Sequence, residues 1–269
     1  MIAVVDYQKG NLKSVERGLI AAGGEALITA DASEIAKADA IVLPGVGAFA
    51  DAAATMCELG QMEAIRDRVR AGVPFLGICL GEHLMFEHGV EGAPEGNPAC
   101  GLGLLPGTVV AMPRYDAQGK TFKVPHVGWN TIEMPACNGS AAVPPCGGVG
   151  GNAVLSSGGA GGGAARSSAA KRGLFEHGAF PSSALQAGSD LAFACPLFNG
   201  IAPGEYFYFT HSYIAPTGSH TIAETTHCVR FTSAVQYGDR AFGVQFHPEK
   251  SSDAGARVLA NFVAIAARG

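Results

Sequence analysis

The sequence predicts an α/β fold: an open, mostly parallel sheet flanked by helices, with an antiparallel extension in its second half. In the first third of the chain, short apolar runs alternate with segments whose apolar residues recur at helical spacing. That order is typical of parallel βαβ units. Beyond residue 200 the apolar runs are strand-like and close together in the sequence, which favours antiparallel pairing.

The first half supplies the parallel strands and the helices between them. Residues 2–5 form an uncharged apolar run, as expected of a buried strand. Leu12, Val15 and Leu19 then recur at helical spacing and predict a helix over 11–22. The other elements expected here are strands at 25–29, 40–43 and 74–78, a helix over 55–71 broken at Gly60 and stopped by Gly72, and a short helix near 82–87.

The second half is rich in predicted strands and closes with a helix. Ala254, Val258 and Phe262 share one face of a helix expected over 251–267. The predicted strands are 107–111, 205–209, 220–226, 231–237 and 242–246.

Composition indicates one domain with an interruption. The chain has 269 residues, of which 48% are hydrophobic and 15% charged, and this balance excludes a highly charged disordered chain. Of its 38 glycines, 13 fall in 136–195 together with 14 Ala, 8 Ser and only five charged residues. Such a segment buries too little apolar surface to offset its ordering entropy. We therefore expect a single domain over 1–269, interrupted by a flexible Gly/Ala/Ser-rich insertion at about 136–195.

Charge, cysteine usage and the N-terminal run bear on partners and location. The net charge of −5 does not favour a nucleic-acid partner. The apolar run at the start is too short for a signal peptide, and no apolar run has the length of a membrane span. The seven cysteines are odd in number and include no Cys-x-x-Cys pair, which argues against a disulfide framework or a zinc site. We expect a cytoplasmic protein with no metal, no cofactor and no membrane partner.

The strand predicted at 74–78 leads directly to a candidate nucleophile. Cys79 lies between Gly77 and Gly81 in the sequence Gly-Ile-Cys-Leu-Gly. This is the pattern of a nucleophile elbow with Cys in place of Ser, and the N-terminus of a following helix favours a thiolate. An isolated cysteine at a strand end is usually a small buried residue, but the two glycines favour the nucleophile.

Two further segments fit the same chemistry. A nucleophilic thiol needs a base and an orienting group, and His247 and Glu249 project to the same face if the chain there is extended. An exposed turn is an equally good interpretation of that pair alone.

The glycine-rich turn at 44–47 exposes backbone N–H groups that, with the N–H of Leu80, suit an oxyanion hole. On spacing alone an ordinary strand-to-helix loop is favoured there.

Taken together, the elbow at 77–81 and the His-Pro-Glu sequence at 247–249 resemble the signature of the class I, triad-type glutamine amidotransferases. The segments 6–15, 44–49, 125–130, 208–213 and 245–251 resemble, among these, the glutaminase subunits of imidazole glycerol phosphate synthase. These segments lie in the family's order and cover the chain except for the insertion.

This resemblance implies a reaction and a partner. Cys79 would attack the carboxamide carbon of glutamine, His247 would relay protons and Glu249 would orient His247. The ammonia released from the γ-glutamyl thioester would pass to a (β/α)₈ cyclase subunit in a heterodimer, which makes imidazole glycerol phosphate and aminoimidazole carboxamide ribotide in histidine biosynthesis. Activity is expected to fall at acid pH, where an ordinary histidine is held protonated.

The resemblance also implies roles for other positions. Gly45 and Val46 match the segment that supplies an oxyanion donor after a partner-induced rearrangement. The matching glutamine-binding positions are Gly47, His83, the backbone of His211, Ser212 and Tyr213. The positions that match the partner interface are Asn11, Trp129 and Lys250, for which the alternatives are a helix N-cap, a core aromatic residue and a solvated lysine.

Departures from the family pattern leave other functions open. The family usually continues the elbow as Gly-Met-Gln, whereas this chain has Glu82 and His83 after Gly81. We expect Glu82 to point outward, and a neutral His83 has one donor where Gln has two. The alternatives are an amidotransferase of another synthase, a stand-alone γ-glutamyl cysteine hydrolase, and a non-catalytic scaffold in which His83 has abolished glutamine binding.

Overall fold

The computed structural model describes residues 1–135 and 193–268. Residues 136–192 of the predicted insertion lie outside the described residues. Phe193 and Cys195, which the sequence assigns to the end of the insertion, are buried in the core, and the ring of Phe193 lies 4.8 Å from that of Phe198. The packed domain therefore includes residues from Phe193 onward.

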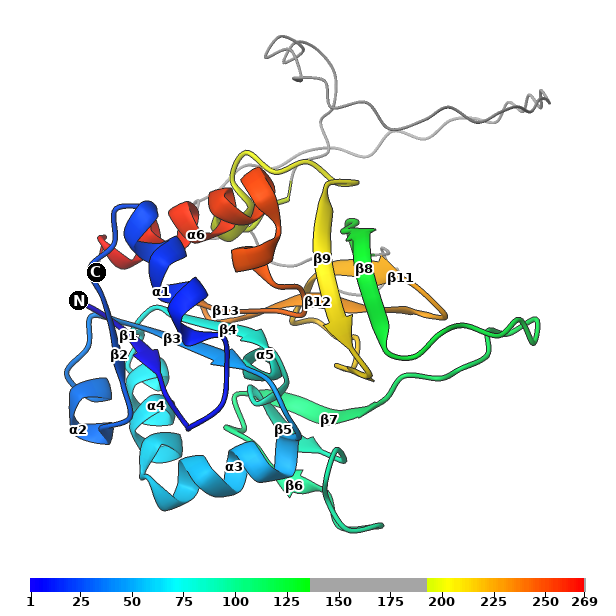
Figure 1. Ribbon diagram of the computed structural model, residues 1–269, viewed down its shortest axis with the longest axis horizontal. Coiled ribbons are helices and arrows are strands. Elements are labelled where there is room, and N and C mark those ends of the chain that lie inside the picture. The colour runs from blue at the N-terminus through cyan, green and yellow to red at the C-terminus, as the bar shows by residue number, and fades with distance from the viewer. Residues whose placement is uncertain (136–192, 269) are drawn as a thin grey trace, which may run out of the picture. The chain divides into compact units, whose positions relative to one another are not determined.

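A seven-stranded sheet runs through the domain (Figure 1). In spatial order its strands are β11 (Thr221–Thr226), β12 (Arg230–Tyr237), β13 (Ala241–Val244), β4 (Phe75–Cys79), β3 (Ala40–Gly45), β1 (Ile2–Val5) and β2 (Ala26–Thr29). The strands from β13 to β2 are parallel to their neighbours, whereas β11, β12 and β13 pair antiparallel. The predicted parallel sheet with an antiparallel extension is confirmed.

Helices cover both faces of this sheet. They are α1 (Leu12–Ala21), α2 (Ala32–Ile35), α3 (Phe49–Glu58), α4 (Gln61–Arg70), α5 (Leu80–His83) and α6 (Ser252–Ala266). Because side chains alternate along a strand, Val4 of β1 packs in the cluster that contains residues of α1 and α6, whereas Val5 packs in the cluster that contains residues of α2, α3 and α4. Each face of the sheet therefore has its own apolar core.

Two predicted helices differ from those observed. The helix expected over 55–71 is two helices, because Gly60 adopts φ 68°, and the first of them begins earlier, at Phe49. The helix expected near 82–87 is wrong: α5 begins directly after Cys79, and Phe86–Gly89 form a strand, β5. Phe86 is buried there and Glu87 is exposed, which is the alternation of a half-buried strand.

Two smaller sheets border the large one. The strands β10 (Tyr213–Ile214), β7 (Leu105–Ala111), β5 and β6 (Ala99–Cys100) form a four-stranded sheet. A separate antiparallel ribbon pairs β8 (His126–Thr131) with β9 (Tyr206–His211). Two short 3₁₀ helices, η1 (Pro196–Phe198) and η2 (Pro248–Lys250), precede β9 and α6.

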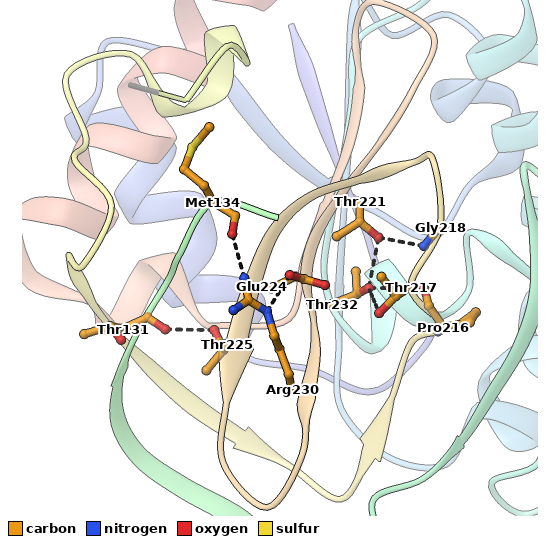
Figure 2. Close-up of polar contacts among 10 residues, drawn as sticks. All are labelled: Thr131, Met134, Pro216, Thr217, Gly218, Thr221, Glu224, Thr225, Arg230 and Thr232. Carbon is orange, nitrogen blue, oxygen red and sulfur yellow. Dashed lines mark hydrogen bonds and ion pairs between the residues drawn. The ribbon is translucent and has the colours of Figure 1, made fainter. Parts of the chain in front are cut away.

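Polar contacts fasten the antiparallel extension to the end of β8 (Figure 2). Arg230 Nε lies 2.6 Å from Glu224 Oε2, and the same guanidinium donates to the carbonyl of Met134 at 2.7 Å. The Thr225 hydroxyl donates to the carbonyl of Thr131 at 2.9 Å. The chain is thus held to the β11–β12 hairpin up to the last described residues before the insertion.

Candidate active site

Cys79 lies at a sharp turn between a strand and a helix. It is the last residue of β4, and Leu80 begins α5 at once. Its backbone has φ 54° and ψ −106°, a region that non-glycine residues rarely occupy and that costs about 1–3 kcal/mol. The strain lifts the side chain from the sheet edge at the N-terminus of a helix, as the nucleophile-elbow interpretation predicts.

The two glycines around Cys79 are required by close packing. A Cβ on Gly77 would lie 2.5 Å from the carbonyl oxygen of Gly81. A Cβ on Gly81 would collide with the carbonyl oxygen of Leu43 on the neighbouring strand. The elbow therefore closes only with glycine at both positions.

His247 and Glu249 lie beside the elbow because β13 is the parallel neighbour of β4, so that both strands end at the same edge. His247 Nδ1 lies 3.0 Å from Glu249 Oε1. The expectation of an extended chain through both residues is wrong, because β13 ends at Val244 and η2 begins at Pro248. The 3₁₀ turn brings the two side chains together, and Ser251 holds it by donating to the carbonyl of His247 at 2.6 Å.

The imidazole of His247 is placed to carry charge. Burial lowers its pKa, but attraction to Cys79 and Glu249 outweighs burial and raises the pKa to about 9. Within the described residues, the buried Nε2 of His247 makes no geometrically complete hydrogen bond. The ring is therefore fixed through Nδ1, which leaves Nε2 for the sulfur or for a reacting group.

The glycine-rich turn at 44–47 lies on the other side of the elbow, since Gly45 of β3 pairs with Cys79 of β4. Leu80 is the first residue of α5, so its N–H has no acceptor within the helix. The N–H of Val46, in contrast, donates to the hydroxyl of Tyr7 at 3.0 Å. Tyr7 is fully buried, and its contact with Val46 could not be expected from the sequence.

A cavity of about 410 Å³ opens over Cys79. All five predicted glutamine-binding residues line it, whereas Gly45 and Glu249 are not part of its wall. The residues around it are Val46, Gly47, Ala48, Cys79, Leu80, His83, Glu91, Pro125, Thr210, His211, Ser212, Tyr213 and His247. Segments distant in the sequence thus meet around one sulfur atom.

Gln245, which the sequence analysis does not single out, connects His83 to the nucleophile. His83 Nε2 lies 2.8 Å from Gln245 Oε1, and Gln245 Nε2 donates to Cys79 Sγ at 3.6 Å. Burial lowers the pKa of His83 to about 4, so the ring is neutral. With the amide in this orientation, Nε2 of His83 carries the proton and Nδ1 is an acceptor.

His126 and His211 form a buried pair, and His211 lines the cavity. His211 Nδ1 donates to the carbonyl of Tyr213 at 2.8 Å, so its Nε2 accepts from His126 Nδ1 at 3.0 Å. Asn130 Nδ2 lies 3.3 Å from the remaining nitrogen of His126. Burial lowers the pKa of His126 to about 4 and that of His211 to about 3, so both rings are neutral. Their side chains fix the β8–β9 ribbon and present the backbone of His211 to the cavity.

The expectation that Glu82 points outward is wrong. It is fully buried, and within the described residues neither carboxylate oxygen has a hydrogen-bond partner. Its side chain packs over Gly243, beside Met85 and Val235, because the missing Cβ of Gly243 leaves room for it. Burial raises the pKa of Glu82 well above its ordinary value.

Two of the three predicted partner-facing residues, Trp129 and Lys250, lie at the surface near the His247 turn. Trp129 is 50% exposed, which contradicts the core alternative, and its ring meets that of Tyr208 at 6.1 Å. Lys250 Nζ lies 5.9 Å from the same Tyr208 ring. Asn11 is at the N-cap position of α1, but its side chain makes no capping hydrogen bond.

The described residues contain neither a cluster suited to a metal ion nor a helix suited to a membrane. No group of three or more His, Cys, Asp or Glu residues there is arranged to hold a metal ion. No helix of that part of the chain is long and apolar enough to cross a membrane.

The chain matches known proteins along nearly its whole length. The profile of a family described as glutamine amidotransferase class-I matches residues 3–139 and 157–266. A protein of Moorella thermoacetica is 36% identical over 263 residues, which cover 97% of this chain and 93% of that protein. One of Rhodopirellula baltica is 35% identical over 264 residues, with 97% and 96% covered. Both relatives bear the name imidazole glycerol phosphate synthase subunit HisH.

Solved structures share the fold at low sequence identity. A glutamine amidotransferase crystal structure superposes with a TM-score of 0.58 at 16% identity, covering 99% of this chain and 98% of the other. The glutaminase domain of Trypanosoma brucei CTPS with bound acivicin gives 0.54 at 14% identity, with 99% and 93% covered. From the profile match and the near-full-length relatives together, the chain belongs to the class-I glutamine amidotransferase family and, within it, to the HisH subunits.

Proposed function

We propose that this chain is the glutaminase subunit of imidazole glycerol phosphate synthase, and that it releases ammonia from glutamine through a thioester on Cys79. The observation that carries the proposal is the convergence of Cys79 with the hydrogen-bonded His247–Glu249 pair at one sheet edge, under a cavity of about 410 Å³. The membership in the HisH group supplies the pathway, histidine biosynthesis.

The proposed reaction has two steps, formation and hydrolysis of the thioester, and all three triad residues take part in both. The Cys79 thiolate attacks the carboxamide carbon of glutamine, and the imidazolium of His247 gives its proton to the departing ammonia. His247, now neutral, takes a proton from water, which attacks the thioester and releases glutamate and the thiolate. Glu249 holds the ring through Nδ1 in both steps.

The other residues of the cavity have proposed binding roles. The N–H of Leu80, with a donor from the Gly45–Val46 peptide segment, would stabilise the tetrahedral oxyanion. Gly47, the backbone of His211, Ser212 and Tyr213 would hold the amino-acid end of glutamine.

His83 lines the same cavity, and its Nδ1 makes no hydrogen bond to another described residue. Its neutral ring offers substrate an acceptor, where the amide of a glutamine at this position would offer a donor as well.

The partner would be a (β/α)₈ cyclase subunit in a heterodimer. Trp129, Lys250 and Asn11 would face it: Trp129 and Lys250 are exposed near the His247 turn, and Asn11 is half-buried at the N-cap of α1. Trp129 and Val127 of β8 and Tyr206 of β9 are large exposed apolar side chains, the kind that anchors protein interfaces. Ammonia released over Cys79 would then enter the barrel without crossing bulk water. The cytoplasm is the proposed location.

The test is reconstitution with the cyclase subunit that pairs with HisH subunits. We expect glutamine-dependent formation of imidazole glycerol phosphate by the pair, and its loss in Cys79→Ala, while ammonia added directly restores synthesis by that variant. Glutamine-dependent synthesis that survives Cys79→Ala would refute the thioester mechanism. Vigorous glutaminase activity from the isolated chain, unchanged by the cyclase, would favour a stand-alone hydrolase.

A further inference from the structure

A chain of hydrogen bonds runs from the β8–β9 ribbon to the wall of the cavity. It begins at the side-chain amide of Asn130, passes through the rings of His126 and His211, and ends at the carbonyl of Tyr213. The three links measure 3.3, 3.0 and 2.8 Å in that order. We call these four residues the imidazole chain. None of them belongs to the triad.

The direction of the imidazole chain follows from its end at Tyr213, whose carbonyl can only accept, so Nδ1 of His211 carries a proton. Both rings are neutral at pH 7, because burial lowers the pKa of His126 to about 4 and that of His211 to about 3. A neutral ring has one proton, so Nε2 of His211 is an acceptor and Nδ1 of His126 donates to it. Nε2 of His126 then accepts from Asn130, whose amide nitrogen also donates to the carbonyl of Thr226 at 2.9 Å.

The middle of the chain is held in place by aromatic stacking. The His126 ring stacks on that of Phe209, with the centroids 5.0 Å apart and the planes 24° apart. It also stacks on the His227 ring at 4.2 Å and 20°, and His227 Nε2 lies 2.9 Å from the carbonyl of Lys123. The donor to His211 is therefore fixed from two neighbours as well as from Asn130.

The last link closes a tight turn at the proposed glutamine-binding segment. β9 ends at His211 and β10 begins at Tyr213, so Ser212 is the one residue between two strands of different sheets. The carbonyl of Ser212 accepts from the N–H of Met112 at 2.8 Å, and the His211 ring spans the junction to reach the carbonyl of Tyr213. Residues 211–213 all line the cavity. The conformation of these peptides thus depends on a hydrogen bond of the His211 side chain.

We propose that His126 and His211 are positioning residues for glutamine, because the imidazole chain holds the peptides of 211–213 in the conformation that binds the amino-acid end of the substrate. Breaking the chain should therefore raise KM for glutamine and leave kcat little changed. The loss of one hydrogen bond corresponds to a factor of about 2 to 12. The inference rests on the proposed function, since it takes glutamine as the substrate of the cavity.

The experiment compares His211→Gln with His211→Asn in the complex with the cyclase subunit. The amide nitrogen of Asn can take the place of Nδ1 and donate to Tyr213, whereas that of Gln takes the place of Nε2. Gln is closer to His in volume, so a role in packing alone favours Gln. We expect KM for glutamine to rise about 2- to 12-fold in His211→Gln, with kcat within about twofold of the parent, and to rise less in His211→Asn.

His220→Asn is the matched control. The His220 ring also donates to a backbone carbonyl, that of Pro216 at 3.1 Å, and it does so through Nε2. Asn cannot reach that position, so the variant loses a comparable hydrogen bond. His220 is not part of the cavity wall, however, and this variant should lose stability and keep the KM of the parent.

NMR of the ring nitrogens reads the chain in the parent protein, without any substitution. We expect His126 and His211 both to be neutral at pH 7 with the proton on Nδ1. Free neutral histidine in water mostly carries its proton on Nε2, so the two rings should stand apart from an exposed histidine.

Three results overturn the proposal. They are a KM in His211→Gln no higher than in His211→Asn, a kcat that falls in His211→Gln while KM stays, and a proton on Nε2 of either ring at pH 7. Failure of the proposed function gives a different outcome: the parent chain would show no glutamine-dependent synthesis with the cyclase, while the NMR signature of both rings would persist.

Discussion

Replacement of the buried Glu82 should stabilise the protein, and by more at higher pH. The side chain is fully buried beside Met85 and Val235, and its carboxyl group has no hydrogen-bond partner within the described residues. A buried polar group without a partner costs about 1–3 kcal/mol. Glu82→Met keeps a similar length and removes both oxygens, so we expect a gain of about that size even near pH 4, where most of the carboxyl is protonated in the unfolded chain as well.

The pH dependence follows from the raised pKa of Glu82, whose cause is burial. Above its ordinary value of 4.5 the unfolded chain releases this proton, whereas the folded chain keeps it. The folded state then binds more protons than the unfolded state, so stability falls as pH rises, by about 1.4 kcal/mol per pH unit. The advantage of Glu82→Met should therefore grow as pH rises above 4.5, up to the raised pKa of the folded chain.

Urea unfolding followed by far-ultraviolet circular dichroism at pH 4, 5.5 and 7 measures this difference. Glu82→Gln is the matched control: it cannot ionise, so it should remove the pH-dependent part, but its amide is still unpartnered and should give little gain at pH 4. An advantage of Glu82→Met that is the same at every pH, or a variant less stable than the parent at pH 7, would refute the assignment of a buried neutral carboxyl.

Three further predictions concern catalysis and the partner. Because the pKa of His247 is raised to about 9, its proton is kept through neutral pH, and kcat/KM should fall about tenfold per unit above pH 9; a pH–rate profile with no alkaline limb would contradict the imidazolium role. Gln245→Leu removes a donor to the Cys79 sulfur and should lower kcat and the rate of iodoacetamide alkylation by about tenfold, with KM little changed; an unaltered alkylation rate would argue against this contact. Trp129→Ala should weaken cyclase binding in titration calorimetry by about 2 kcal/mol, whereas Leu27→Ala, an exposed side chain on the edge strand β2, should not; equal effects would remove Trp129 from the interface.

The sequence was sufficient for the elbow and for the layout of the sheet because both depend on local signals. Glycines at 77 and 81 mark a turn that only glycine can close, and apolar runs before 79 and 247 mark strands whose ends meet at one edge. The pairing of His247 with Glu249 was predicted from an extended chain, yet a 3₁₀ turn produces it. The residue types and their order were thus enough to predict that His247 pairs with Glu249. They were not enough to predict the backbone conformation that joins the two residues.

The features that could not be predicted are those in which the position of a side chain depends on residues far away in the sequence. A glutamate beside a nucleophile is by default a solvated residue, and Glu82 is buried only because Gly243, far along the chain, leaves a space for it. The contact of Gln245 with Cys79 spans 166 residues, and that of Tyr7 with Val46 spans 39. No periodicity or spacing reports contacts of this kind.

These buried groups together explain why the charge of His247 can govern the site. Burial raises the pKa of Tyr7 and lowers that of His83 to about 4, so both are neutral near pH 7. Burial also raises the pKa of Glu82, which favours its neutral form. A negative charge at Glu82, next to the elbow, would disfavour a thiolate at Cys79, whereas a neutral carboxyl does not. His247 moves in the opposite direction, because its charged partners outweigh burial. The sequence predicts a histidine lost to protonation on the acid side; with its pKa near 9, the ring is charged through neutral pH, and its titration lies on the alkaline side. Neutralising the surrounding groups thus leaves the His247 imidazolium as a counter-charge for the Cys79 sulfur, and substitutions at Tyr7, Glu82 or His83 should leave the position of the alkaline limb unchanged.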